Sequence, residues 1–169
     1  FQACKDQIPI SFVHFSYNKR KFNAVTVHPI LMKEFDNRWY VVGYSEHHDA
    51  LRTFGFDRIY DPLLLRKKFI KAKSKEQDLY FKDVYGVYPF ADEEKQTITI
   101  NCSPLVTNYF KAYPIHASQE VFKDEYGNSE ITFQLVPSME LVRLFRSYAN
   151  QLRVMKPLWI HDYITKTNR

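Results

Sequence analysis

Residues 1–65 alternate short β-type segments with polar turns, and this alternation restricts the fold more than any other feature of the sequence. Residues 10–17 and 22–28 are rich in β-branched and aromatic residues, and a polar turn at 18–21 separates them. Residues 30–35, 39–44 and 51–56 repeat the pattern after a turn at 36–38 and a polar loop at 45–49. Apolar positions do not recur every three and four residues, so helices fit poorly. Four or five short strands joined by tight turns predict a small barrel or a strongly bent sheet.

Two details refine this prediction. Pro29 follows residues 22–28 directly, and proline in a sheet favours a strand end or an edge. Residues 39–44 form a nearly continuous apolar run, which indicates a strand covered on both faces.

Residues 96–169 show a different order of elements. A strand at 96–101 precedes a helix at 105–112 that Pro104 opens, and a hairpin of 120–123 and 130–135 turns at 124–128. Ser138 is the expected N-cap of a helix at 139–149, and residues 152–155 form a last strand that Pro157 ends. The order β-α-β-β-α-β predicts a ferredoxin-like domain.

Residues 66–95 differ from both flanks, because a lysine- and arginine-rich stretch gives way to acidic residues. We expect a linker here with one short helix at about 78–85 that Gly86 stops. The predicted organisation is therefore an α+β chain with a barrel at 1–65, a linker at 66–95 and a second domain at 96–169.

Positive charge is concentrated at the beginning of the chain. Residues 1–75 contain 14 lysines and arginines against 7 acidic residues, a net charge of +7, whereas residues 76–95 have a net charge of −4 and residues 96–169 of +2. This distribution favours an anionic partner for residues 1–75, and a solvated basic surface without a partner is the alternative.

Several function classes find no support in the sequence. There is no apolar run of membrane-spanning length and no signal peptide, and Cys4 and Cys102 are too isolated for a metal site, which indicates reduced thiols in a cytoplasmic protein. His47 and His48 are adjacent but lack a third ligand at a useful spacing, and His14 and Ser16 have no acid partner for a nucleophilic triad. Phosphate-binding glycine motifs and a nucleophile elbow are absent from the sequence. We expect no enzyme activity, no cofactor and no metal.

Basic residues interleaved with aromatic residues are the strongest chemical signal. Lys19, Arg20 and Lys21 lie between Tyr17 and Phe22 at one turn. Residues 52, 54, 56 and 58, spaced at period two, are two arginines with two phenylalanines between them. Such a face could hold phosphate and stack a flat ring. The alternative is that Phe54 and Phe56 point into the core while Arg52 and Arg58 extend from its rim.

Three segments, read together, resemble one known family. Residues 27–29 (VHP), 38–44 (RWYVVGY) and 52–59 (RTFGFDRI), with Tyr17 before them, resemble the WYL domain over about residues 8–65, and the tail at about 96–165 resembles the extension that commonly follows it. Val41 replaces the leucine of the motif, and Val25 stands where many members have a basic residue.

The resemblance implies an Sm-like, SH3-like five-stranded barrel in a bacterial transcriptional regulator that senses an effector. By this resemblance the ligand face contains Tyr17, Arg52 and Arg58, with His28 as a weaker candidate, and the basic turn adds Lys19 and Arg20. Trp39 is expected in the core.

The favoured ligand is a nucleotide or single-stranded nucleic acid. Operator DNA would be bound by an upstream winged helix-turn-helix, and a homodimer without membrane contact is expected. A constitutive nucleic-acid-binding or oligomerisation module is the competing function.

Overall fold

The computed structural model describes residues 1–71, 82–90, 93–123, 129–148 and 150–166. The chain divides into two compact units, Phe1–Asp78 and Leu79–Arg169. This division falls inside the segment expected to be a linker, and the proposed three-part boundaries stay a prediction.

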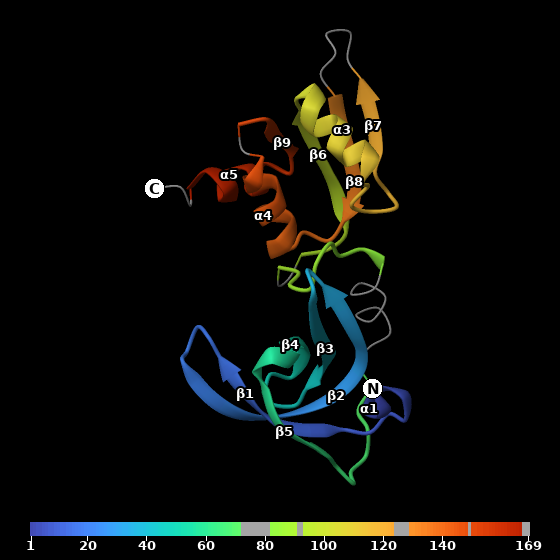
Figure 1. Cartoon of the computed structure of the whole chain (residues 1–169), viewed down its shortest axis with the longest axis vertical. Helices are drawn as coiled ribbons and strands as arrows, with labels where there is room; N and C mark the ends of the chain where they lie inside the picture. Colours follow the sequence, from blue (N-terminus) through green and yellow to red (C-terminus); the bar gives the residue numbers. More distant parts are fainter. Residues whose placement is uncertain (72–81, 91–92, 124–128, 149, 167–169) are drawn as a thin grey trace. The chain divides into compact units, whose positions relative to one another are not determined.

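The first unit is a single bent sheet with a short helix. Its elements are α1 (Gln2–Lys5), β1 (Ile10–Ser16), β2 (Lys21–Phe35), β3 (Arg38–Ser45), β4 (Ala50–Gly55), the 3₁₀ helix η1 (Phe56–Arg58) and β5 (Ile59–Leu64). The strand order is β4-β3-β2-β1-β5, and every neighbouring pair is antiparallel. Figure 1 shows the strands curving around a common interior, so the barrel-like prediction for this part of the chain is confirmed.

Strand β2 connects the two parts of this sheet, because its two halves pair with different strands. Residues Lys21 to Val27 pair with β1, and Val27 to Phe35 pair with β3. Of the two alternatives at Pro29, the strand end is wrong, because β2 continues through it and the register with β3 shifts between Pro29 and Leu31. A bulge of this kind lets a strand bend and accommodates a proline without ending the strand. The edge position agrees with the structure, since β1 pairs with β2 only as far as Val27.

The turn from β2 to β3 follows directly from its sequence. Phe35 pairs with Arg38, so the loop consists of Asp36 and Asn37 alone, and their φ values are 52° and 58°. A two-residue hairpin loop with both φ values positive is the type I′ turn, which asparagine and aspartate tolerate.

The core of the first unit is small. Its buried cluster consists of five residues that alternate on the inner faces of β1 to β4: Phe12, Val25, Val27, Val41 and Phe54. Tyr40 and Val42, on the opposite face of β3, are also buried, which confirms the expectation of a strand covered on both faces. Trp39 was expected in the core, but it lies at the beginning of β3 and is 47% exposed.

The second unit has the predicted ferredoxin-like order. It contains β6 (Gln96–Cys102), α3 (Pro104–Ala112), β7 (Glu120–Lys123), β8 (Ser129–Leu135), α4 (Met139–Ser147), β9 (Leu152–Lys156) and α5 (Leu158–Lys166). The strand order β7-β8-β6-β9 places the first and third strands at the centre of the sheet, as this topology requires. Apolar residues of α3, α4 and α5 join the buried cluster on this sheet.

Local signals for these helices agree with the sequence. The Ser138 hydroxyl accepts a hydrogen bond from the Leu141 amide, and the Ser103 hydroxyl accepts one from the Val106 amide, so both serines are N-caps. Helices α1 and α5 were not predicted. For α5 the reason is that Pro157 was interpreted only as a strand end. The expected helix at 78–85 and the expected turn at 124–128 lie largely or entirely outside the described residues. Within 82–90, Val84 and Pro89 form isolated bridges to Val136 and Ser138 of the second unit.

Candidate functional site

A polar hollow lies on the inner face of the β1–β2 hairpin, next to β4. It has a volume of about 210 Å³. Ten residues line it: His14, Ser16, Lys19, Asn23, Val25, His47, His48, Arg52, Thr53 and Phe54. We call this cavity the cationic hollow, since these ten residues include a lysine, an arginine and three histidines and none of them is acidic.

Strand register explains how these residues meet. His14 on β1 is directly opposite Asn23 on β2, so both side chains lie on the face that also carries Phe12 and Val25. Phe54 forms the bottom of the hollow, because it is buried and its ring packs edge-on against His14 with centroids 5.1 Å apart. Arg52, two residues earlier on β4, is exposed, and its Nη1 donates a 2.8 Å hydrogen bond to the Leu51 carbonyl.

Two histidines of the hollow are held toward the neutral form. Burial, followed by the nearby Arg58 guanidinium, lowers the pKa of His14 below its usual 6.5. Burial, followed by the Arg52 guanidinium, lowers the pKa of His48, whose Nδ1 also lies 2.9 Å from the Ser45 hydroxyl. The hollow therefore gains positive charge as pH falls, and an anion bound in it would favour protonation.

Two of the predicted ligand residues, Tyr17 and Arg58, are not among the residues that line the hollow, although the Arg58 guanidinium is near enough to lower the pKa of His14. The guanidinium carbon of Arg58 lies 4.9 Å from the centre of the Tyr17 ring, and the Tyr17 hydroxyl donates a 3.2 Å hydrogen bond to Asp57. Arg58 Nε is also 3.7 Å from an Asp57 oxygen. Tyr17 and Arg58 thus contact each other at the end of β1, whereas Lys19 and Arg52 line the hollow.

The predicted face formed by residues 52, 54, 56 and 58 is not one strand face. Strand β4 ends at Gly55, and Phe56 to Arg58 form η1, so the alternation stops after residue 54. Phe54 belongs to the core, while Phe56 is exposed and lines a different cavity. The core interpretation was therefore correct for Phe54 and wrong for Phe56.

His28 and Arg20 lie outside the lining of the cationic hollow. His28 is fully buried, its Nε2 is 2.7 Å from a Glu46 oxygen, and its Nδ1 accepts a 2.9 Å hydrogen bond from the Ile70 amide. Glu46 also pairs with Lys67 at 2.5 Å, so this network fastens residues 67–70 to the sheet. Arg20 is exposed at the β1–β2 turn, where its φ is 48°.

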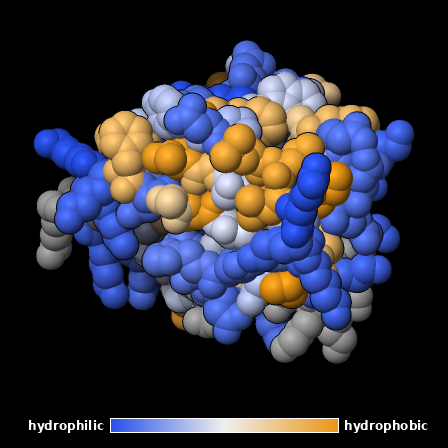
Figure 2. Space-filling view, turned by 90° about the horizontal axis from the view of Figure 1, so that it is seen from below, coloured by the Kyte–Doolittle hydropathy of each residue, from blue (hydrophilic) through white to orange (hydrophobic). Residues whose placement is uncertain are grey.

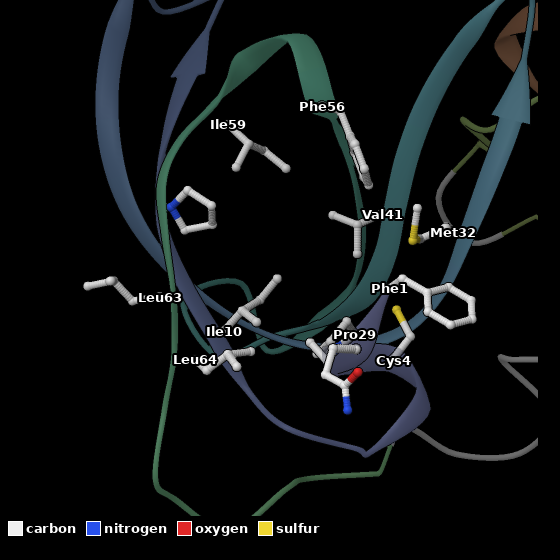
Figure 3. Close-up of a pocket in the computed structure, with 13 residues that line it drawn as sticks. Phe1, Cys4, Ile10, Pro29, Met32, Val41, Phe56, Ile59, Leu63 and Leu64 are labelled. Atoms are coloured by element: carbon white, nitrogen blue, oxygen red, sulfur yellow. The ribbon is translucent and has the colours of Figure 1, made fainter.

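A second cavity, drawn in Figure 3, is apolar. It has a volume of about 440 Å³, and side chains from α1, from η1 and from the sheet, including Val41, Phe56 and Ile59, point toward it. None of the side chains that line it is charged. Phe1, Leu63 and Leu64 at its edge are strongly exposed, and Figure 2 shows a continuous hydrophobic area on one face of the molecule.

Metal binding and thiol chemistry find no support in the structure. The described residues contain no group of three or more histidine, cysteine or acidic side chains that could hold a metal ion. Cys4 and Cys102 are free thiols, and burial raises the pKa of Cys102 to about 12, which makes it a poor nucleophile. No helix in the described part of the chain is long and apolar enough to cross a membrane.

Sequence reasoning missed several lining residues of the hollow. Asn23 and Thr53 were not singled out, and His14, Ser16, His47 and His48 were considered only for catalysis or metal binding. Part of the signal was present: pairing outward from the predicted turn at 18–21 places His14 opposite Val25, and the observed register differs by two residues, which keeps the same face but places His14 opposite Asn23. The approach of residues 47–48 to this hairpin could not be read from spacing, because it depends on the curvature of the sheet.

Taken together, the fold and the cationic hollow define a two-unit α+β protein with an anion-compatible cavity in a barrel-like first unit. The family model of the WYL domain matches residues 1–62, so this part of the chain is similar to the WYL domain. A comparison with curated proteins gives no match.

Two solved structures are similar over nearly the whole chain. A structure described as a CRISPR Cas-related protein is similar with a TM-score of 0.57 and 10% identity, covering 99% of this chain and 47% of that one. Proteasome accessory factor B/C (PafBC) of Arthrobacter aurescens gives a TM-score of 0.40 and 13% identity, covering 96% of this chain and 24% of that one. The chain therefore spans less than half the length of either protein.

Proposed function

We propose that this chain is the effector-sensing part of a bacterial transcriptional regulator, and that its cationic hollow binds a phosphate group of a nucleotide or of single-stranded nucleic acid. The WYL domain supports a regulatory, ligand-sensing role in general. The observation that carries the specific proposal is the hollow itself, where Lys19, Arg52 and neutral polar side chains line a cavity without an acidic residue among them.

The chemistry of the lining fits a phosphate. Arginine offers several N–H donors in a planar arrangement that matches phosphate oxygens, and lysine adds a point charge. Asn23 and Ser16 supply uncharged donors that could complete the contacts. In the regulator as a whole, we propose a cytoplasmic homodimer that binds operator DNA through another domain and has no catalytic activity.

Replacing Arg52 tests the site. We expect Arg52→Gln to weaken binding of a single-stranded oligonucleotide and to reduce the salt dependence of its affinity by roughly 0.7 log units per log unit of salt, since one phosphate contact is lost. Fluorescence anisotropy at several salt concentrations measures both quantities. The matched control is Arg153→Gln, which removes an exposed arginine on β9 of the second unit and should change neither.

Two results would decide against the proposal. Unchanged affinity and slope in a folded Arg52→Gln variant would remove the hollow as the binding site. A protein whose melting temperature does not rise with nucleotides or oligonucleotides would instead fit an oligomerisation module without an effector, because a ligand that binds the folded state must stabilise it.

A further inference from the structure

Four aromatic rings form a continuous cluster on the outer face of the β1–β2 hairpin and β5. Phe15 lies opposite Phe22, with ring centroids 4.8 Å apart, and Phe22 contacts Tyr60 at 5.6 Å. Tyr17 continues the row from Phe15 at 5.8 Å. We call Phe15, Tyr17, Phe22 and Tyr60 the aromatic platform.

The platform is on the opposite face of the hairpin from the cationic hollow. Side chains alternate along β1, so Phe15 points away from the face that carries His14 and Ser16. The register agrees, because Val13 pairs with both Ala24 and Tyr60, two residues of the outer face. The two features therefore share one hairpin and are joined by the turn that contains Lys19.

The platform is open to solvent. Phe22 is 63% exposed, Tyr17 58% and Tyr60 46%, whereas the aromatic residues Phe12 and Phe54 of the inner face are buried. Contiguous exposed aromatic rings on a protein surface mark a binding site more often than isolated ones do.

The charges around the platform favour an anionic ligand. Lys19, Arg20 and Lys21 lie at the turn that ends it, and Arg58 packs on Tyr17. Two acidic residues are also near: Asp57, which accepts the hydrogen bond from Tyr17, and Asp61, which follows Tyr60. Exposed rings beside a cationic turn are the arrangement that binds unpaired bases and their phosphates together.

We infer that the aromatic platform stacks unpaired bases of a single-stranded nucleic acid whose backbone crosses the β1–β2 turn at Lys19. This inference rests on the proposed function, and it narrows the ligand from any nucleotide to a strand long enough to reach both faces of the hairpin. Stacking gives affinity without sequence readout, since every base has a flat face.

The test compares strands with and without bases on the full chain. The probes are a thymidine oligonucleotide of about ten nucleotides, a uridine oligonucleotide of the same length, and an abasic deoxyribose-phosphate strand. We expect the abasic strand to bind much more weakly than the thymidine strand. Comparison of the thymidine and uridine strands shows whether DNA or RNA is preferred. Tighter binding of either strand than of the abasic strand supports the platform.

Variants locate the effect. Phe22→Ala and Tyr60→Ala should each weaken thymidine-strand binding about tenfold to a hundredfold at an unchanged salt slope, because stacking involves no counterion release. Tyr60→Phe should restore binding. Phe122→Ala removes a similarly exposed phenylalanine from β7 in the second unit and is the matched control. Circular dichroism confirms that each variant is folded.

The outcomes separate the platform from the hollow. Equal binding of the thymidine and abasic strands, or full affinity in Phe22→Ala and Tyr60→Ala, overturns the platform even if Arg52→Gln weakens binding. Loss of binding in the aromatic variants with no effect of Arg52→Gln supports the platform and rejects the hollow. Self-association that Phe22→Ala abolishes, with oligonucleotide affinity unchanged, would assign the platform to a second copy of the chain and overturn the inference.

Discussion

At the scale of single residues, the histidines of the first unit serve different purposes according to their surroundings. His14 and His48 line the cationic hollow beside arginines, whereas His28 is buried and bonded through both ring nitrogens. A histidine in a sequence therefore gives no role by itself, and its neighbours in space decide whether it can meet a ligand.

The lowered pKa values of His14 and His48 predict that binding strengthens in acid. Both side chains are more neutral near pH 7 than an unperturbed histidine, and protonation adds positive charge to the hollow. We expect the affinity for inorganic phosphate or an oligonucleotide to increase as pH falls below 6.5. Isothermal titration calorimetry in buffers of different ionisation enthalpy should show proton uptake on binding, and a His14→Gln/His48→Gln variant should lose it.

The same two groups predict the opposite trend for the free protein. Since their pKa values are lowered in the folded state, the unfolded chain binds more protons below pH 6.5, and the free energy of unfolding falls as pH decreases through that range. Bound phosphate should reduce this loss. Urea unfolding at several pH values, with and without phosphate, measures both effects. If the difference in free energy of unfolding between the unaltered chain and the His14→Gln/His48→Gln variant does not change with pH, the two histidines are not the groups responsible.

For His28 we expect a structural effect. His28→Ala leaves a cavity and an unpaired Ile70 amide in place of a buried ring, so the free energy of unfolding should drop by about 2–4 kcal/mol. Because His28 does not line the hollow, oligonucleotide affinity should be unchanged in the folded variant. His47→Ala, at an exposed position, should cost less than about 0.5 kcal/mol. Loss of binding at unchanged stability would return His28 to the ligand residues.

At the scale of elements, the bulge in β2 depends on close contact with β3. A Cβ atom at Gly43 would lie 2.5 Å from the His28 carbonyl oxygen and 2.9 Å from Pro29 Cα, both backbone atoms that cannot rotate away. Gly43 thus permits the approach of β3 to the stretch of β2 that contains Pro29. Without it the two halves of β2 could not keep their different partners at this distance.

Gly43→Ala tests this contact. We expect a loss of about 1–3 kcal/mol in the free energy of unfolding, since the clash involves backbone and the strands must separate. Gly55→Ala is the comparison: its new Cβ would meet the side chains of Asp57 and Arg58, which can move, so the loss should be smaller. Chemical denaturation of both variants gives the ranking, and an equal or reversed order would show that β3 does not need the glycine.

At the scale of the whole molecule, the two units have separate cores of unequal size. The buried cluster of the second unit draws on its sheet and on α3, α4 and α5, whereas that of the first unit consists of the five side chains named above. Stability from apolar burial grows with the area removed from water, so the first unit should be the less stable one.

We therefore expect the fragments 1–78 and 79–169 to fold separately, with the higher melting temperature in the second. A single-stranded oligonucleotide should raise the melting temperature of fragment 1–78 and leave that of fragment 79–169 unchanged, because the hollow and the aromatic platform both belong to fragment 1–78. Differential scanning calorimetry of the two fragments and the full chain is the measurement. An oligonucleotide-induced shift confined to fragment 79–169 would place the ligand in the wrong unit for our proposal.

The sequence by itself determined the elements whose signals are local. The Asp36–Asn37 turn, Pro104 at the start of α3, the N-cap of α4 at Ser138 and the alternating strands follow from φ preferences, a capping hydrogen bond and period-two burial, which all act within a short stretch of chain. The WYL motifs added the class of the first unit. The concentration of positive charge in residues 1–75 pointed to the same part of the chain as the proposed site.

Only the tertiary structure decided how the basic and aromatic residues group. The end of β4 at Gly55, the curvature that carries His47 and His48 to the β1–β2 hairpin, and the burial of His28 all arise from contacts between residues far apart in the chain. These contacts separated Tyr17 and Arg58 from Lys19 and Arg52, although all four lie in one motif-bearing region. A strand pattern fixes which side chains share a face, but the bend of the sheet fixes which faces meet.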